Sequence, residues 1–377
     1  MLTLVFRLLL ECTIWQRHQM AQRNQNEVAT PIPWAGRARG IRWIYWRGVE
    51  LAPHLEWLGE MRRRILGTPQ PGSAAYKRMV ADEINSFTEV HRSAAKIDRR
   101  LTEPAPAVWE KIQDLCLERI RARTGNDIVG HVASRLRVRP GARLVSLGCG
   151  PGGVELAVAR EAPHAHYLCF DLNPNLLALG REQAMKEDLR FTFQEADLNT
   201  LVFPVAEFDV ALCYASLHHL ISLEHVLKQI HRSLRPGGAL VVMDVCTPSG
   251  FQMRPETRRK ARTVWDTLPD RYRLNHTAYA SPRPDTELWA GDTRRSGMEC
   301  ARSGDILPLL RHYFQESMFV PLLSLATRFL NPMYGPNFNL DEPLDSSIAK
   351  WIWELDCFLI ESGQLQPESF FGVYEPR

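Results

Sequence analysis

The 377-residue sequence has few of the features that mark membrane, secreted or metal-binding proteins. No apolar run reaches the roughly 20 residues that a membrane-spanning helix needs, and residues 1–15, the best candidate, are interrupted by Arg7 and Glu11. The eight cysteines include no CxxC pair and several stand inside apolar runs, so we expect buried free thiols and a reducing, cytoplasmic compartment. Because there is also no HExxH motif and no carboxylate pair at ligand spacing, we expect no metal site.

A strong charge of one sign is also missing. The net charge of +3 is too small by itself to indicate a nucleic-acid partner. Acidic residues are absent between positions 28 and 49, where arginines are interleaved with tryptophan and tyrosine. We therefore expect residues 1–95 to form an N-terminal helical accessory region of basic and aromatic character. Three functions are possible for residues 30–65: packing on the chain's own domain, peripheral membrane association and RNA binding. Their composition favours packing most and RNA binding least.

Short apolar segments alternate with helical patterns from residue 143 onward. Five of these segments have the length and composition of buried strands: 143–147, 166–170, 190–194, 208–214 and 239–245. Two more strands are expected near 316–325 and 370–374. The alternation predicts an α/β fold, doubly wound, with a mostly parallel seven-stranded sheet and an antiparallel last strand. Residues 247–300 interrupt the alternation after the fifth strand, and we expect them to form a cap insert.

A glycine-rich turn follows the first strand. Gly148, Gly150 and Gly153 fit the GxGxxG fingerprint of dinucleotide-binding folds, and Asp171 stands where the ribose-binding acid of such folds is expected. Glycine allows a positive φ and a close approach of ligand to backbone. Taken alone, these residues leave a nicotinamide-dependent dehydrogenase open, although no downstream catalytic domain for such an enzyme is visible.

Three further segments distinguish such a dehydrogenase from a second class of enzyme with the same type of fold. They accompany the next strands in a fixed order: Glu195-Ala196-Asp197-Leu198, Ser216-Leu217-His218-His219 and Leu234-Arg235-Pro236-Gly237-Gly238. With these segments the chain resembles the class I (Rossmann-like) S-adenosylmethionine-dependent methyltransferases, particularly a bacterial branch with SLGCG, ADLNTL, SLHH and LRPGG signatures. The resemblance implies one methyltransferase domain over residues 96–377, with residues 247–300 as its substrate cap.

The resemblance also implies S-adenosylmethionine as the cofactor and a set of residues that hold it. The glycines of the turn line its methionine part, Asp171 takes the ribose, and Asp197 with Leu198 frames the adenine. Ser146 stands where many class I enzymes have an acid, and we expect Glu155 to substitute for that acid at the cofactor's ammonium group. The full cofactor-binding set is Ser146, Gly148, Cys149, Gly150, Gly152, Glu155, Asp171, Leu172, Asp197, Leu198 and Tyr214.

Two adjacent histidines follow the fourth strand. Methyl transfer gains much of its rate from positioning the acceptor and excluding water, but a hydroxyl acceptor also loses a proton. His218 and His219 are candidates for that base or for orienting the acceptor, with packing against the cofactor loop as the alternative. Asp244, at the end of the fifth strand, is the third catalytic candidate, although Val245 follows it where relatives often place a second carboxylate.

The cap insert is rich in arginine and aromatic residues, which suits sugars, phosphorylated intermediates or acidic small molecules. We therefore expect a cytoplasmic S-adenosylmethionine-dependent methyltransferase that acts on oxygen or nitrogen of a small molecule or a glycan intermediate. Two alternatives stay open. One is a methyltransferase for RNA or protein that uses the basic N-terminal arm, and the other is a non-catalytic cofactor-binding scaffold, which Ser146 and Val245 would support.

Overall fold

The computed structural model describes residues 69–96, 107–277, 281–289 and 296–377. Residues 68–377 form one compact unit. The basic and aromatic segment 30–65 lies outside the described residues, and so do the membrane and RNA interpretations that depend on it. Within the described ranges, every helix is too short or too polar to span a lipid bilayer.

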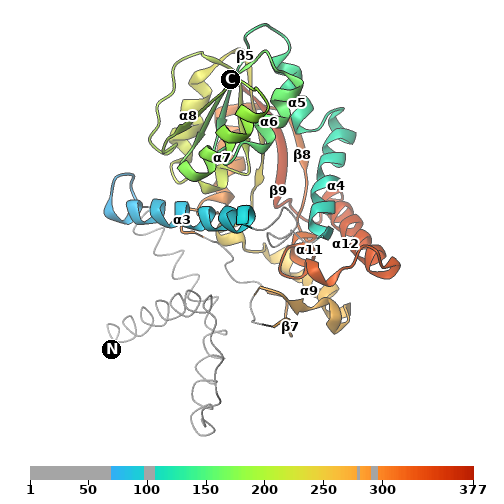
Figure 1. Ribbon diagram of the computed structural model, residues 1–377. Helices are drawn as coiled ribbons and strands as arrows, with labels where there is room; N and C mark the ends of the chain where they lie inside the picture. Colours follow the sequence, from blue (N-terminus) through green and yellow to red (C-terminus); the bar gives the residue numbers. More distant parts are fainter. Residues whose placement is uncertain (1–68, 97–106, 278–280, 290–295) are drawn as a thin grey trace. The chain divides into compact units, whose positions relative to one another are not determined.

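A seven-stranded sheet forms the centre of this unit (Figure 1). Its strands are β1 (Arg143–Leu147), β2 (His166–Asp171), β3 (Phe191–Glu195), β4 (Phe208–Tyr214), β5 (Leu234–Val245), β8 (Phe314–Pro321) and β9 (Ser369–Pro376). They lie in the order β3-β2-β1-β4-β5-β9-β8. Strands β1 to β5 run parallel, whereas β9 is antiparallel to both of its neighbours. The predicted mostly parallel sheet with an antiparallel last strand is confirmed.

The central strands are buried on both faces, which explains their continuous apolar sequence. Residues 144–147 of β1 and 210–213 of β4 are all buried. Successive side chains of a strand point to opposite faces, so Leu144 packs in one hydrophobic core and Val145 in another. Two cores, one on each side of the sheet, are what a parallel sheet covered by helices on both faces requires.

Helices supply the apolar partners for both faces. One core receives the buried residues of α4 (Ala107–Thr124), α5 (Ile128–Leu136), α6 (Gly153–Glu161) and α7 (Pro174–Lys186). The other core receives those of α8 (Leu223–Ser233) and α10 (Ile306–Tyr313). The predicted doubly wound arrangement is therefore present.

The segment predicted as a cap insert folds into short elements beside the sheet. They are α9 (Pro255–Thr267), β6 (Leu274–Asn275) and β7 (Arg283–Pro284), and they are followed along the chain by α11 (Thr327–Leu330) and α12 (Pro343–Glu361). Two large aromatic side chains of the insert, Trp265 and Tyr272, are used for packing, whereas Trp289 is exposed. The ring of Trp265 lies 5.0 Å from that of Tyr334, and Tyr272 stacks on Phe338 with the ring centroids 5.0 Å apart.

Gly180 sets how closely α7 approaches the sheet. A Cβ atom at this position would lie 2.7 Å from the ring of Phe193 on β3 and 2.9 Å from the carbonyl oxygen of Pro151. Both distances are shorter than real Cβ contacts. Because Pro151 belongs to the glycine-rich turn, the same close contact also positions that turn.

We predict that Gly180→Ala lowers the free energy of unfolding by about 1–3 kcal/mol, the usual cost of overpacking a core. We expect this loss even though alanine is more favourable than glycine in a helix by about 1 kcal/mol. Gly153→Ala, at the start of α6 with nothing within 4 Å of the added Cβ, is the matched control and should leave stability unchanged or raised. Thermal unfolding of the two variants checks this, and equal stability would contradict a tight contact at Gly180.

Candidate functional site

A pocket of about 190 Å³ lies at the carboxyl edge of the sheet, where the loops after β1, β2, β3 and β4 meet. In open α/β sheets, ligands bind at this edge where the strand order reverses, here between β1 and β4. Helix α3 (Ala74–Lys96) crosses the edge and supplies another wall (Figure 1). The lining residues are Glu83, Ile84, Phe87, Gly148, Gly150, Pro151, Asp171, Leu172, Asn173, Leu176, Ala196, Asp197, Leu198, Asn199, Ala215, Ser216, His219, Leu220 and Met298.

The glycine-rich turn after β1 contributes backbone to the pocket. Gly148, Gly150 and Gly152 all have a positive φ. At Gly148, where φ is +70°, a Cβ atom would lie only 2.7 Å from the Cβ of Ser216, so a side chain there would be both strained and obstructed. Of the predicted cofactor-binding residues in this turn, Gly148 and Gly150 line the pocket, whereas Gly152 and Cys149 are not among the lining residues.

Asp171, at the end of β2, joins the pocket to this turn. Its carboxylate accepts hydrogen bonds from the backbone N–H groups of Gly150 at 2.7 Å and of Asn173 at 2.8 Å. Burial raises the pKa of the carboxyl group, while the two N–H donors act in the opposite direction. An ionised carboxylate has about four acceptor sites, so Asp171 keeps acceptor capacity for a ligand. The predicted neighbour Leu172 also lines the pocket.

Asp197 and Leu198 line the pocket beyond β3, and Asp197 is already paired with α3. The hydroxyl of Tyr76 donates to its two oxygens, at 2.9 and 2.8 Å. The backbone N–H and side-chain amide of Asn199 donate to Oδ1 as well, at 3.0 and 3.1 Å. Burial, together with the adjacent carboxylate, raises the pKa of Tyr76, so its hydroxyl remains a donor.

Ser146 and Glu155 lie next to the glycine-rich turn but are not among the lining residues. Both are buried, and the Ser146 hydroxyl donates to Oε1 of Glu155 at 2.5 Å. Burial raises the pKa of Glu155 from 4.5 to about 7, because the charged form is poorly solvated there. Tyr214, also predicted to bind the cofactor, is partly buried against the core and likewise does not line the pocket.

The raised pKa of Glu155 makes stability depend on pH. The folded state holds this proton up to about pH 7, whereas the unfolded state releases it near 4.5, so stability falls as pH rises between these values. Each pKa unit corresponds to about 1.4 kcal/mol, so the loss amounts to at most about 3 kcal/mol.

We predict that Glu155→Gln removes most of this loss. Between pH 4.5 and about pH 7, the interval set by the two pKa values, the free energy of unfolding should fall less in the variant than in the wild type. Chemical denaturation at several pH values measures it, with Glu161→Gln at the exposed end of the same helix as the control. An identical pH dependence in wild type and Glu155→Gln would show that the carboxyl group is ionised normally.

The turn after β4 carries the two histidines, and Asp244 fixes its conformation. Oδ2 of Asp244 accepts the backbone N–H groups of Ser216 at 3.0 Å and Leu217 at 2.7 Å. Its Oδ1 lies 2.6 Å from Nδ1 of His218. Since a carboxylate accepts, Nδ1 of His218 is the protonated nitrogen and Nε2 carries the lone pair. Both His218 and Asp244 are buried.

His219 lines the pocket and is contacted from α3. Its Nδ1 lies at ion-pair distance, 2.7 Å, from a carboxylate oxygen of Glu83, and Phe87 packs edge-on against its ring. Burial disfavours the charged imidazolium, but the carboxylates of Glu83, Glu299 and Asp244 outweigh it and raise the pKa of His219. Of the three predicted catalytic residues, His219 lines the pocket and is contacted from α3, whereas His218 and Asp244 are buried next to it and are not among the lining residues.

Sequence reasoning missed the contribution of α3. Tyr76, Val80, Ile84 and Phe87 are spaced as one face of a helix, which was a visible signal of burial. The spacing does not indicate that this face covers the pocket. Of the predicted cap insert, Met298 lines the pocket.

Part of the chain is similar to known methyltransferases. Residues 144–238 match the family model described as a methyltransferase domain. The 27-O-demethylrifamycin SV methyltransferase of Amycolatopsis mediterranei is 33% identical over 138 residues, which cover 35% of this chain and 50% of that protein. The demethylmenaquinone methyltransferase of Thermus thermophilus is 33% identical over 106 residues, or 28% of this chain and 48% of that protein. The chain thus spans about half the length of these relatives.

Two further similarities are more distant. The phosphoethanolamine N-methyltransferase of Triticum aestivum is 26% identical over 141 residues, covering 36% of this chain and 28% of that protein. A solved geranyl diphosphate methyltransferase in complex with S-adenosylmethionine is 15% identical, with a TM-score of 0.39, covering 66% of this chain and 84% of that chain.

The matched region is a methyltransferase domain of the S-adenosylmethionine-dependent kind. It contains β1 to β4 with the glycine-rich turn, Asp171, Asp197 and both histidines. The match supports the predicted class of enzyme for residues 144–238, whereas the activity of the whole chain, the bacterial branch and its signatures stay predictions.

Proposed function

We propose that the whole chain is an S-adenosylmethionine-dependent methyltransferase that methylates oxygen or nitrogen of a small molecule. One observation carries this proposal: the glycine-rich turn, Asp171 and Asp197 line one pocket, and His219 lines the same pocket. The relatives named above are methyltransferases of demethylrifamycin SV, demethylmenaquinone and phosphoethanolamine, all of them small molecules.

The residues present fit the cofactor. The backbone of Gly148 and Gly150 is accessible without a side chain in the way, and Asp171 retains acceptor capacity for ribose hydroxyls. Asp197 and Leu198 would frame the adenine, with the Tyr76 hydroxyl sharing the Asp197 carboxylate. S-adenosylmethionine, when bound, supplies a methyl group already activated by its sulfonium. Ser146 and Glu155 support the turn from behind in this assignment.

In this proposal, the turn after β4 forms the end of the pocket that binds the methyl acceptor. Much of the rate of methyl transfer can come from positioning and water exclusion, and α3 covers the pocket on this side. The lone pair on Nε2 of His218, which Asp244 maintains through Nδ1, can take the proton that a hydroxyl or amine acceptor loses. His219 is held beside it by Glu83.

The size of the pocket favours a small molecule over RNA or protein. Its volume of about 190 Å³ and the wall that α3 supplies fit a small acceptor better than a polymer. A glycan intermediate therefore enters this proposal only as a short, soluble sugar. Cytoplasmic location and peripheral membrane association through residues 30–65 stay predictions.

We expect wild-type protein to bind S-adenosylmethionine in calorimetric titration, and Asp171→Asn to bind it at least tenfold more weakly. Tenfold corresponds to about 1.4 kcal/mol, a modest value for the loss of one charged ribose contact. Asp266→Asn, an exposed aspartate on α9, is the matched control and should bind as wild type does. NAD should not bind measurably. Equal affinity in Asp171→Asn, or binding of NAD in place of S-adenosylmethionine, would contradict the proposed function.

A further inference from the structure

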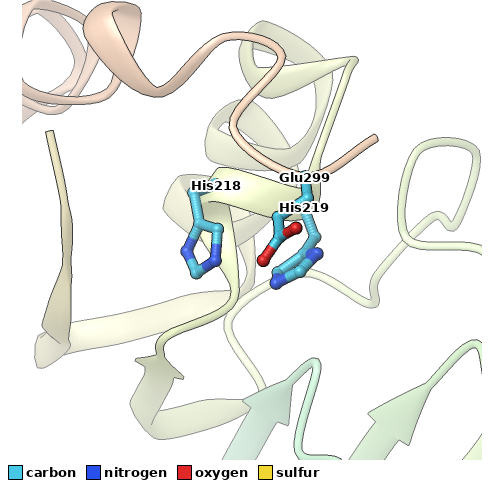
Figure 2. A group of neighbouring side chains, drawn as sticks. All are labelled: His218, His219 and Glu299. Carbon is cyan, nitrogen blue, oxygen red and sulfur yellow. The ribbon is translucent and has the colours of Figure 1, made fainter. Parts of the chain in front are cut away.

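His218, His219 and Glu299 form a cluster that the sequence motifs did not reveal. In the described part of the chain, this is the one group of three such side chains whose possible ligand atoms all lie within 4.8 Å of one another. Figure 2 shows the Glu299 carboxylate beside the rings of both histidines. The earlier expectation of no metal site rested on motifs with short spacing, whereas Glu299 is 80 residues away from His219 in sequence.

The backbone holds the two parts of the cluster together. The histidines lie on the short 3-10 turn Leu217–His219. The backbone N–H of Cys300 donates to the carbonyl of His218 at 2.8 Å, which fastens the Glu299 segment to that turn. His218 and Glu299 are buried, whereas His219 is partly buried and lines the pocket. The three side chains are therefore placed by the fold.

Each histidine is backed by a carboxylate on its Nδ1 side. Asp244 lies 2.6 Å from Nδ1 of His218, and Glu83 lies 2.7 Å from Nδ1 of His219. Metal-binding histidines in proteins usually have such a carboxylate, which fixes the tautomer and orients the free nitrogen. Asp244 makes this hydrogen bond to His218, whereas Glu83 contacts His219 at ion-pair distance without hydrogen-bond geometry. Three carboxylates around two imidazoles also favour a cation among them.

The donor set indicates the kind of cation. Two imidazole nitrogens and one carboxylate oxygen suit divalent transition metals with open coordination positions, such as Zn²⁺ or Fe²⁺. Mg²⁺ prefers oxygen ligands and retains its waters. Metal–ligand distances of about 2.0–2.2 Å place ligand atoms roughly 3.4 Å apart. The ligand atoms lie within 4.8 Å of one another, so each pair needs to approach by at most about 1.4 Å.

We propose that His218, His219 and Glu299 bind one divalent transition-metal ion, with Asp244 and Glu83 orienting the two imidazoles. The proposal deepens the proposed function and rests on it for placing these residues at the acceptor end. His219 and Met298 line the pocket, so a bound metal would lie at its wall. There it would act as a Lewis acid toward the acceptor, and His218 would hold it through Nε2, the atom that takes the acceptor's proton when no metal is bound.

The test is calorimetric titration of the untagged, metal-stripped full chain with Zn²⁺, and with Mg²⁺ for comparison. We expect wild type to bind one Zn²⁺ and to bind Mg²⁺ far more weakly. Glu299→Gln and His219→Ala should each weaken Zn²⁺ binding at least tenfold. His164→Ala, which removes an exposed histidine far along the chain from the cluster, should bind as wild type does.

A second readout keeps the test valid if a variant is less stable. Zn²⁺ should raise the unfolding temperature of wild type and of His164→Ala more than that of the two cluster variants, since a ligand stabilises only the state that binds it. Unchanged Zn²⁺ affinity in both cluster variants, or wild-type binding of Zn²⁺ no tighter than of Mg²⁺, would overturn the metal site. Titration of the same samples with S-adenosylmethionine tests the proposed function separately, because cofactor binding does not require the metal.

Discussion

The contact between α3 and the carboxyl edge of the sheet is the interaction on which the site depends. Tyr76 donates to Asp197, and Glu83, seven residues later, pairs with His219. Seven residues are two helical turns, so both side chains lie on one face of α3. A single helix thereby engages the acid assigned to the adenine and the histidine assigned to the acceptor. The sheet alone would leave these groups on an open surface.

The same contact limits what the pocket can admit. A volume of about 190 Å³ lies below the roughly 300–1,000 Å³ of typical ligand sites. The strands that carry Asp171 and Asp197 are fixed by continuous parallel ladders, whereas α3 is held by side-chain contacts at the edge. Local opening of a protein usually occurs in such less stable elements. We therefore expect α3 to move outward to admit cofactor and acceptor, and to return over them.

The sequence predicted the sheet well and identified part of the pocket lining, including Gly148, Asp171 and Asp197, because both depend on local patterns. The cofactor-binding roles of these residues stay predictions. Parallel strands buried on both faces leave continuous apolar runs, and the turn at Gly148 requires a residue type that is easily recognised. The roles of Tyr76 and Glu299 depend on contacts across about 120 and 80 residues, which no local pattern contains. The segment that contains Trp265 has the composition expected of a substrate lid, but the Trp265 ring is buried against Tyr334. Sequence alone does not distinguish an aromatic residue that binds substrate from one that packs in the core.

Hydrogen exchange of the α3 backbone with and without S-adenosylmethionine tests the central claim, that α3 completes the cofactor pocket, most directly. Ile84 and Phe87 line the pocket, so a bound cofactor adds contacts to this part of the helix. The account predicts that exchange over residues 76–88 slows when S-adenosylmethionine is added, together with exchange in the glycine-rich turn. Slower exchange in the turn with no change over residues 76–88 would contradict it, because the cofactor would then bind without α3.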